Sequence, residues 1–214
     1  MTLAVFASGG GTNFQSMIDA AERGDLPARI ALCVSNRPEA GALDRARQHG
    51  IPTAVLDPDA FDSKAAHVEA LRAALAAQQI NFVALAGYLR KIPAAIVDRF
   101  RGRMTNIHPA LLPAFGGRGM YGMNVHRAVI EHGARWSGAT VHLVDEHYDT
   151  GPIVLQQPVP VYPDDTPDDL AARVLAVEHR IYPEALRLFA EDRIRLDGRT
   201  VHIEPPADAP SPAP

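Results

Sequence analysis

Short apolar runs alternate along the chain with stretches in which apolar residues recur every three or four positions. The apolar runs predict strands, and the second pattern predicts amphipathic helices that cover a sheet. The expected strands are residues 3–7, 30–35, 53–56, 82–86, 104–108, 138–144 and 153–159. The expected helices are residues 14–23, 40–48, 63–79, 93–100, 125–130 and 166–189. This alternation predicts an α/β class, Rossmann-like three-layer fold around a mixed, mostly parallel central sheet.

The C-terminal part of the chain departs from the regular alternation. Residues 145–152 join the last two long strands, and a connection this short favours an antiparallel pair. The sheet is therefore expected to be mixed rather than wholly parallel. Pro183 is expected to kink the last helix, and residues 193–202 are expected to form a hairpin around an Asp-Gly turn.

The chain reads as one domain followed by a tail. We expect a single domain over residues 1–204, with an N-terminal half of about residues 1–100 and a C-terminal half of about residues 101–204. The glycine-rich start described below makes the first half a candidate for nucleotide binding. Residues 205–214 consist mainly of Pro and Ala and are expected to be a disordered tail.

Composition narrows the class of partner. The chain has 214 residues, of which 47% are hydrophobic and 21% charged, as in a soluble globular protein. A net charge of -4 gives no reason to expect nucleic acid or a membrane as partner. The single Cys33 excludes an intrachain disulfide. The N-terminus runs straight into a strand without a signal-like leader, so we expect a cytoplasmic protein.

A glycine-rich loop, Ser8-Gly-Gly-Gly-Thr-Asn13, follows the first expected strand and precedes a helix. Glycines let backbone N–H groups approach a ligand, and a helix N-terminus favours an anion. Phe14 replaces the third glycine of a dinucleotide fingerprint, and no lysine nearby completes a P-loop. We therefore predict a monophosphate site in this loop; a tight turn without a ligand is the alternative.

Asn106 and His108 lie two residues apart at the end of the expected strand 104–108. Side chains alternate along a strand, so both project from one face, and Pro109 ends the strand. An amide and an imidazole placed side by side can both donate to one oxygen, which suits the oxyanion formed when a carbonyl is attacked. An ordinary strand-end Asn beside an ordinary His is the alternative for this stretch on its own.

Two loops are candidates for the walls of a pocket. Ligands in open α/β sheets bind at the carboxyl ends of strands, where Leu89 and Ile92 offer apolar contacts and Arg90 is expected to be free to meet a carboxylate. A surface connection is the alternative for this loop. Four of the seven residues in 116–122 are glycine, which predicts a mobile loop long enough to act as a lid.

An acidic and histidine-rich run, residues 142–149, invites a metal-site interpretation. Its residues lack a recognised ligand spacing, and loop carboxylates are normally solvated, so no metal is expected. Asp149 differs from the rest because it directly precedes Thr-Gly-Pro, where a turn can hold it rigidly.

Taken together, four motifs resemble one known family. They are Ser8-Gly-Gly-Gly-Thr-Asn13, Leu85-Ala-Gly-Tyr-Leu-Arg90, Asn106-Ile-His-Pro-Ala-Leu-Leu-Pro113 and Asp149-Thr-Gly-Pro-Ile153. They resemble the folate-dependent formyltransferases, and the first narrows the resemblance to the branch that uses glycinamide ribonucleotide. The resemblance implies the formyltransferase fold, small-molecule substrates, 10-formyltetrahydrofolate as co-substrate, no metal, and a monomer or homodimer.

The resemblance also implies a role for particular residues. Those implied for the ribonucleotide are Gly10, Gly11, Thr12, Asn13 and Lys64 near the phosphate and Glu178 at the ribose hydroxyls. Those implied for the folate, in the C-terminal half and at the end of strand 82–86, are Leu89, Arg90, Ile92, His142 and Val144. The implied catalytic residues are Asn106, His108 and Asp149. Loop 115–123 is longer and richer in glycine than in some relatives, so its ligand contacts do not carry over.

The implied reaction is attack of the glycinamide amine on the formyl carbon. Asn106 and His108 would stabilise the anionic oxygen of the tetrahedral intermediate, and Asp149 would assist proton transfer. We expect Asp149 to favour the imidazolium form of His108. The alternatives are another enzyme that uses 10-formyltetrahydrofolate, either a hydrolase or a transferase with a different amine acceptor, and a non-catalytic nucleotide-binding module.

Overall fold

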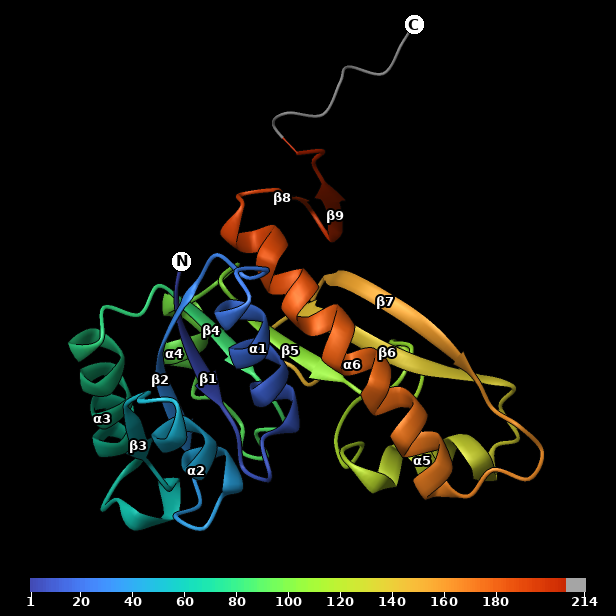
Figure 1. Cartoon of the computed structure of the whole chain (residues 1–214). Coiled ribbons are helices and arrows are strands. Elements are labelled where there is room, and N and C mark those ends of the chain that lie inside the picture. The colour runs from blue at the N-terminus through green and yellow to red at the C-terminus, as the bar shows by residue number, and fades with distance from the viewer. Residues whose placement is uncertain (207–214) are drawn as a thin grey trace, which may run out of the picture.

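A seven-stranded sheet organises the structure, a computed structural model that describes residues 1–206. The strand order is β3-β2-β1-β4-β5-β6-β7 (Figure 1). The strands are β1 (Thr2–Phe6), β2 (Arg29–Ser35), β3 (Thr53–Val55), β4 (Phe82–Leu85), β5 (Met104–His108), β6 (Trp136–Leu143) and β7 (Ile153–Pro160). The first five in sequence run parallel, whereas β6 is antiparallel to both β5 and β7. The mixed, mostly parallel sheet predicted from the sequence is therefore confirmed.

Helices cover both faces of this sheet. They are α1 (Thr12–Glu22), α2 (Gly41–Gln48), α3 (Lys64–Ala77), α4 (Ala94–Arg99), α5 (Met123–Glu131) and α6 (Pro167–Ala190), with a short 3-10 helix η1 (Pro58–Ala60). The alternation of side chains along a strand divides them between two cores. Leu3 and Val5 of β1 pack with α1, α2, α5 and α6, whereas Ala4 and Phe6 pack with α3 and α4. This arrangement gives the three layers expected from the sequence.

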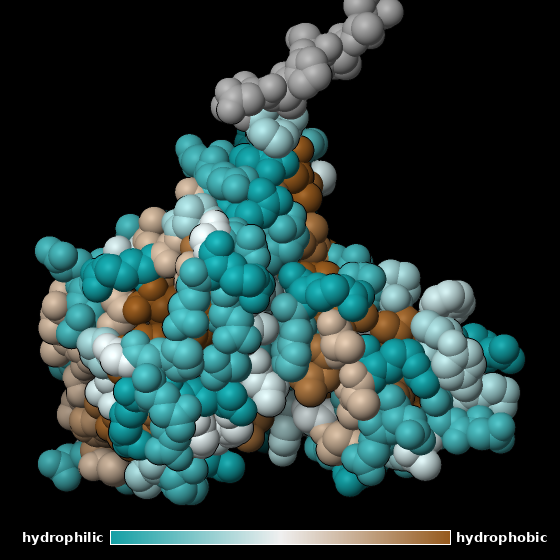
Figure 2. All heavy atoms as spheres, viewed as in Figure 1, coloured by the Kyte–Doolittle hydropathy of each residue, from teal (hydrophilic) through white to brown (hydrophobic). Residues whose placement is uncertain are grey.

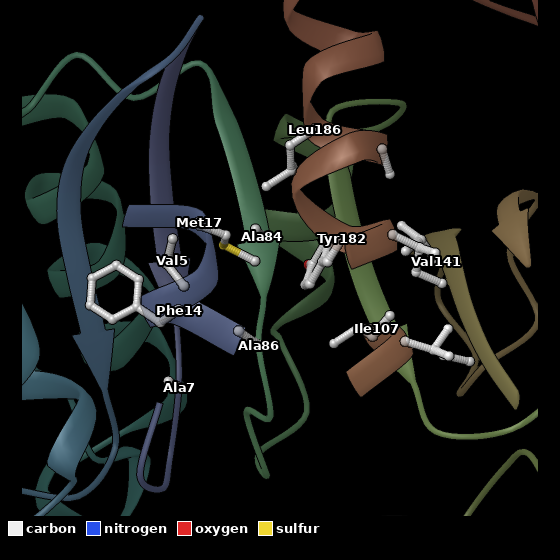
Figure 3. Packing of buried hydrophobic residues seen from close by; sticks show 14 of the residues in the cluster. Val5, Ala7, Phe14, Met17, Ala84, Ala86, Ile107, Val141, Tyr182 and Leu186 are labelled. Atoms are coloured by element: carbon white, nitrogen blue, oxygen red, sulfur yellow. The ribbon is translucent and has the colours of Figure 1, made fainter. Parts of the chain in front are cut away.

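Helix α6 ties the two halves of the sheet together (Figure 3). The hydroxyl of its fully buried Tyr182 lies 3.0 Å from the Leu85 carbonyl oxygen and 3.1 Å from that of Thr105, at neighbouring strands β4 and β5. The helix begins with a capping box between Thr166 and Asp169 and continues through Pro183 to Ala190. This long helix is therefore tied by Tyr182 to the two central strands β4 and β5.

The C-terminal hairpin predicted for residues 193–202 is present as β8 (Ile194–Asp197) and β9 (Thr200–Ile203). Of the predicted tail, residues 207–214 lie outside the described part of the chain. Hydrophilic side chains cover most of the face seen in Figure 2. Within residues 1–206, no helix has the length and apolar character needed to cross a membrane.

Candidate active site

The carboxyl end of β5 opens into a cavity of about 800 Å3. Asn106 and His108 project into it from the same face of β5, as their spacing predicts. The antiparallel neighbour β6 pairs Asn106 with His142 and thereby adds a second imidazole to this wall. Of the predicted site residues, the cavity is lined by Asn13, Leu89, Arg90, Ile92, Asn106, His108, His142, Val144, Asp149 and Glu178.

Asp149 lies between the two imidazoles. One carboxylate oxygen is 3.6 Å from Nδ1 of His108, and the other is 3.6 Å from Nε2 of His142. These are ion-pair distances, longer than a hydrogen bond. The backbone N–H of Gly117 donates to Asp149 at 2.9 Å, so the glycine-rich loop contacts the same carboxylate. The structure thus brings together the three residues that the resemblance assigns to catalysis.

The hydrogen bonds of the two imidazoles fix where their protons lie. Nε2 of His108 is 2.8 Å from the Phe115 carbonyl, and Nδ1 of His142 is 2.9 Å from the Leu143 carbonyl. A carbonyl only accepts, so each of these nitrogens carries a proton. The Asn106 amide nitrogen lies 3.1 Å from Nε2 of His142. Both candidate oxyanion donors, Asn106 and His108, are therefore engaged with protein groups.

Two opposing effects act on the pKa of His108. Burial lowers the pKa of His108, and this effect outweighs the Asp149 carboxylate, which raises it. The side chain of His108 is only 4% exposed. Asp149 therefore acts in the predicted direction, toward the imidazolium, while desolvation of the buried ring lowers the pKa by more. Burial also opposes ionisation of Asp149, yet the neighbouring imidazoles and the Gly117 N–H lower its pKa below the usual range.

Close backbone packing holds the Asp149 turn. Asp149 has a φ of 56°, in the left-handed region that non-glycine residues rarely adopt. A Cβ at Gly116 would lie 3.2 Å from the Asp149 Cβ and 2.5 Å from a Leu112 methyl. One at Gly151 would lie 1.7 Å from the Leu143 carbonyl oxygen. The glycines on both sides therefore allow the carboxylate to approach β5 and β6.

A second polar pair lies in the same cavity. The Asn13 amide donates to the Glu178 carboxylate at 2.7 Å, joining α1 to α6. Burial raises the pKa of Glu178 to about 7, and the bond from Asn13 partly opposes this shift. Within residues 1–206, Oδ1 of Asn13 is buried without a hydrogen-bond partner. The pair thus offers acceptor oxygens, which suits a ligand with hydroxyl groups.

The glycine loop offers backbone N–H groups, rather than side chains, to a ligand. Helix α1 begins at Thr12, two residues earlier than predicted, with Gly11 at its N-cap and no side-chain cap. In the described chain, the N–H groups of Gly10, Gly11, Thr12 and Asn13 donate no hydrogen bond to protein. An uncapped helix start favours an anion. Gly10, Gly11 and Thr12 do not line the 800 Å3 cavity.

The two basic residues among the predicted site residues differ in their surroundings. Arg90 was expected to be free for a carboxylate, but its guanidinium pairs with Asp59 in η1 and lies 3.5 Å from Asp57 at the N-cap of η1. This expectation is therefore wrong, because acids distant in sequence reach the loop. Lys64 is exposed at the first position of α3 and, like Gly10, Gly11 and Thr12, does not line the cavity, so its role near the phosphate stays a prediction.

Ser8 and His126 are not among the predicted site residues. The Ser8 hydroxyl donates to Oδ1 of Asn36 at 2.5 Å and accepts from the Leu89 N–H at 2.8 Å, which links the glycine loop to the loop that follows β4. His126 of α5 is buried and lines the cavity. Apolar residues precede Ser8 and surround His126 in the sequence, and this pattern alone could have indicated that both side chains are buried. Within residues 1–206, no group of three His, Cys, Asp or Glu side chains could hold a metal ion.

An amide, an imidazole and a carboxylate lie together at the end of a strand, which suits acyl transfer. The strand belongs to an open α/β sheet, and a loop suited to binding an anion lies nearby. Residues 1–186 match the family model described as Formyl transferase. The chain therefore belongs to the formyl transferase family.

Named relatives are consistent with this membership. The chain is 49% identical to "Phosphoribosylglycinamide formyltransferase, chloroplastic" of Vigna unguiculata, over 92% of this chain and 64% of that protein. It is 38% identical to "Phosphoribosylglycinamide formyltransferase" of Escherichia coli (strain K12), over 92% of this chain and 90% of that protein. The crystal structure of glycinamide ribonucleotide transformylase 1 from Symbiobacterium toebii superposes with a TM-score of 0.90 at 44% identity, covering 96% of this chain and 94% of that one. The chain thus spans about two thirds of the plant relative and nearly all of the bacterial ones.

Proposed function

We propose that this protein transfers the formyl group of 10-formyltetrahydrofolate to the amine of glycinamide ribonucleotide, a step of purine biosynthesis. The observation that carries the proposal is the convergence of Asn106, His108 and Asp149 on one wall of the cavity that also holds the Asn13–Glu178 pair. The names of the relatives supply the substrates. The folate would lie against Leu89, Ile92, His142 and Val144, with Arg90 at its edge.

The ribonucleotide would extend from the glycine loop to the catalytic wall. Its phosphate would accept from the N–H groups at Gly10, Gly11, Thr12 and Asn13, with Lys64 nearby, and its ribose hydroxyls would meet Glu178. Glycinamide would then place its amine near His108. We also propose a cytoplasmic protein that acts as a monomer or homodimer on small molecules, without nucleic acid.

The reaction follows from these positions. The amine nitrogen attacks the formyl carbon, and the carbonyl oxygen becomes anionic in the tetrahedral intermediate. Asn106 and His108 donate to this oxygen, exchanging their present partners His142 and Phe115 for it. The bond between the carbon and the folate nitrogen then breaks. One proton leaves the amine and one reaches the folate nitrogen, with Asp149, His108 and a water as carriers.

The exchange of hydrogen-bond partners involves the glycine-rich loop, residues 115–123. Phe115 and Gly117 hold His108 and Asp149 in the present structure. The ligand oxygen replaces the Phe115 carbonyl at His108 only when this segment moves. We therefore propose that residues 115–123 act as the lid that the glycine content predicts.

Absorbance-monitored turnover of 10-formyl-folate, with and without glycinamide ribonucleotide, tests the proposal. We expect folate product only when the ribonucleotide is present. Deformylation without the ribonucleotide would identify a hydrolase. Absence of any reaction would favour another acceptor or a non-catalytic binding module, and calorimetry with the ribonucleotide would then separate those two.

A further inference from the structure

Helix α2 lies directly behind the glycine loop and touches its backbone. A Cβ at Gly11 would come within 2.7 Å of the Ala42 Cβ, and one at Gly41 within 3.3 Å of the Gly10 Cα. Gly11 also has a φ of 72°, which favours glycine. The two segments therefore pack closely enough for α2 to hydrogen-bond the carbonyl groups of the loop.

Two such bonds hold successive peptide groups. The Ala42 N–H donates to the Gly9 carbonyl at 3.1 Å, and Nε of Arg45 donates to the Gly10 carbonyl at 2.7 Å. In a planar trans peptide the N–H points opposite to the carbonyl. Because both carbonyls point toward α2, the N–H groups of Gly10 and Gly11 both point away from it. These are two of the N–H groups that donate to no protein acceptor in the described chain.

The Arg45 side chain is itself fixed from a second direction. Its guanidinium also donates to Oε1 of Gln15 on α1 at 3.0 Å, and the Gln15 amide donates to Asp19 at 2.8 Å. A planar guanidinium can make both bonds at once, whereas a lysine ammonium on a flexible stem is not fixed in this way. Arg45 thus bridges α2, the glycine loop and the first turn of α1.

We propose that Arg45 is a positioning residue for the substrate phosphate: it orients the Gly10–Gly11 peptide so that the loop N–H groups face the anion. This inference rests on the proposed function, which places the ribonucleotide phosphate in that loop. Arg45 acts through the backbone. Its removal leaves the loop residues in place but lets the Gly10–Gly11 peptide rotate, which weakens phosphate binding without disturbing the chemistry at His108.

The test compares Arg45→Met with Arg47→Met in the full chain. Arg47 lies on the same helix, and within residues 1–206 its one ion pair is with Asp44 at the surface, so it is a matched control. KM and kcat are measured for glycinamide ribonucleotide and for the riboside that lacks the phosphate. We expect Arg45→Met to raise the ribonucleotide KM about tenfold, the size of one hydrogen bond to a charged group. The riboside kinetics and the Arg47→Met enzyme should stay within about twofold of wild type.

Three results would overturn the assignment. One is an unchanged ribonucleotide KM in Arg45→Met, and another is an equal rise in KM for ribonucleotide and riboside, which indicates general distortion. The third is full recovery in Arg45→Lys, which assigns the effect to charge alone. If wild type fails to use the ribonucleotide, the proposed function fails, and calorimetry with ribose 5-phosphate then tests Arg45 separately. Tenfold weaker binding by Arg45→Met supports its role, whereas equal binding, or none by wild type, overturns it.

Discussion

The two ends of the site present opposite kinds of chemistry. At the end of β5, side chains contact other protein groups: Asn106 contacts His142, and His108 contacts the Phe115 carbonyl and the Asp149 carboxylate. At the start of α1, backbone N–H groups point outward without protein acceptors in the described chain. Under the proposed function, Asn106 and His108 in the first region must exchange their protein contacts for the substrate oxygen. The second is open and needs only a ligand, so substitutions should affect turnover in the first region and binding in the second.

The largest expected effect is that of His108→Ala. Loss of one oxyanion donor lowers turnover by about 10²–10³ in comparable sites, and His108 is also a candidate proton carrier. Ribonucleotide affinity, measured by calorimetry, should stay within about twofold, because the proposed phosphate contacts lie in the other region. Turnover close to that of wild type would break the distinction between the two regions.

Asp149→Asn should lower kcat by about 10²-fold, the lower end of the effect of general acid–base groups. The amide keeps an acceptor for the Gly117 N–H but removes the negative charge near His108. Burial lowers the pKa of His108 and Asp149 raises it, so removal of the charge lowers this pKa further. The limb of the pH–rate profile that reports His108 should move to lower pH. Full activity with an unmoved profile would count against the role of Asp149.

Asn13→Ala probes the open region. The substitution removes the amide that donates to Glu178 and a buried oxygen that has no hydrogen-bond partner among residues 1–206. We expect the ribonucleotide KM to rise about tenfold, with kcat and the folate KM changed by less than about threefold. Steady-state kinetics with each substrate varied in turn measures the split. A rise confined to the folate KM would place Asn13 in the other substrate's site.

The same contrast explains what the sequence could predict. Alternation along β5 placed Asn106 and His108 on one face, because strand geometry is local. The glycine loop was recognised for the same reason. The ion pairs of Arg90 with Asp57 and Asp59 join residues about thirty positions apart in the chain, and no local pattern encodes them. The pKa of His108 depends on a balance between burial and the Asp149 charge, which only the packed structure determines.

The smallest expected effect concerns the pH dependence of stability, at the Glu178 carboxyl that links the regions. Burial raises its pKa to about 7, above the ordinary value of 4.5. The folded state then binds this proton more tightly than the unfolded state, so the stability that it contributes is fully present below the ordinary pKa and is lost as pH rises through about 7.

Glu178→Gln has no proton to lose. Between pH 5 and pH 8 the melting temperature of wild type should therefore fall further than that of Glu178→Gln, by about 2–4 °C for each kcal/mol involved. Glu184→Gln, at a partly exposed position of the same helix, serves as the control. If the Glu178→Gln enzyme loses stability with pH in parallel with wild type, the pKa of Glu178 is not raised in the folded protein. The contrast between the two regions would then rest on geometry alone.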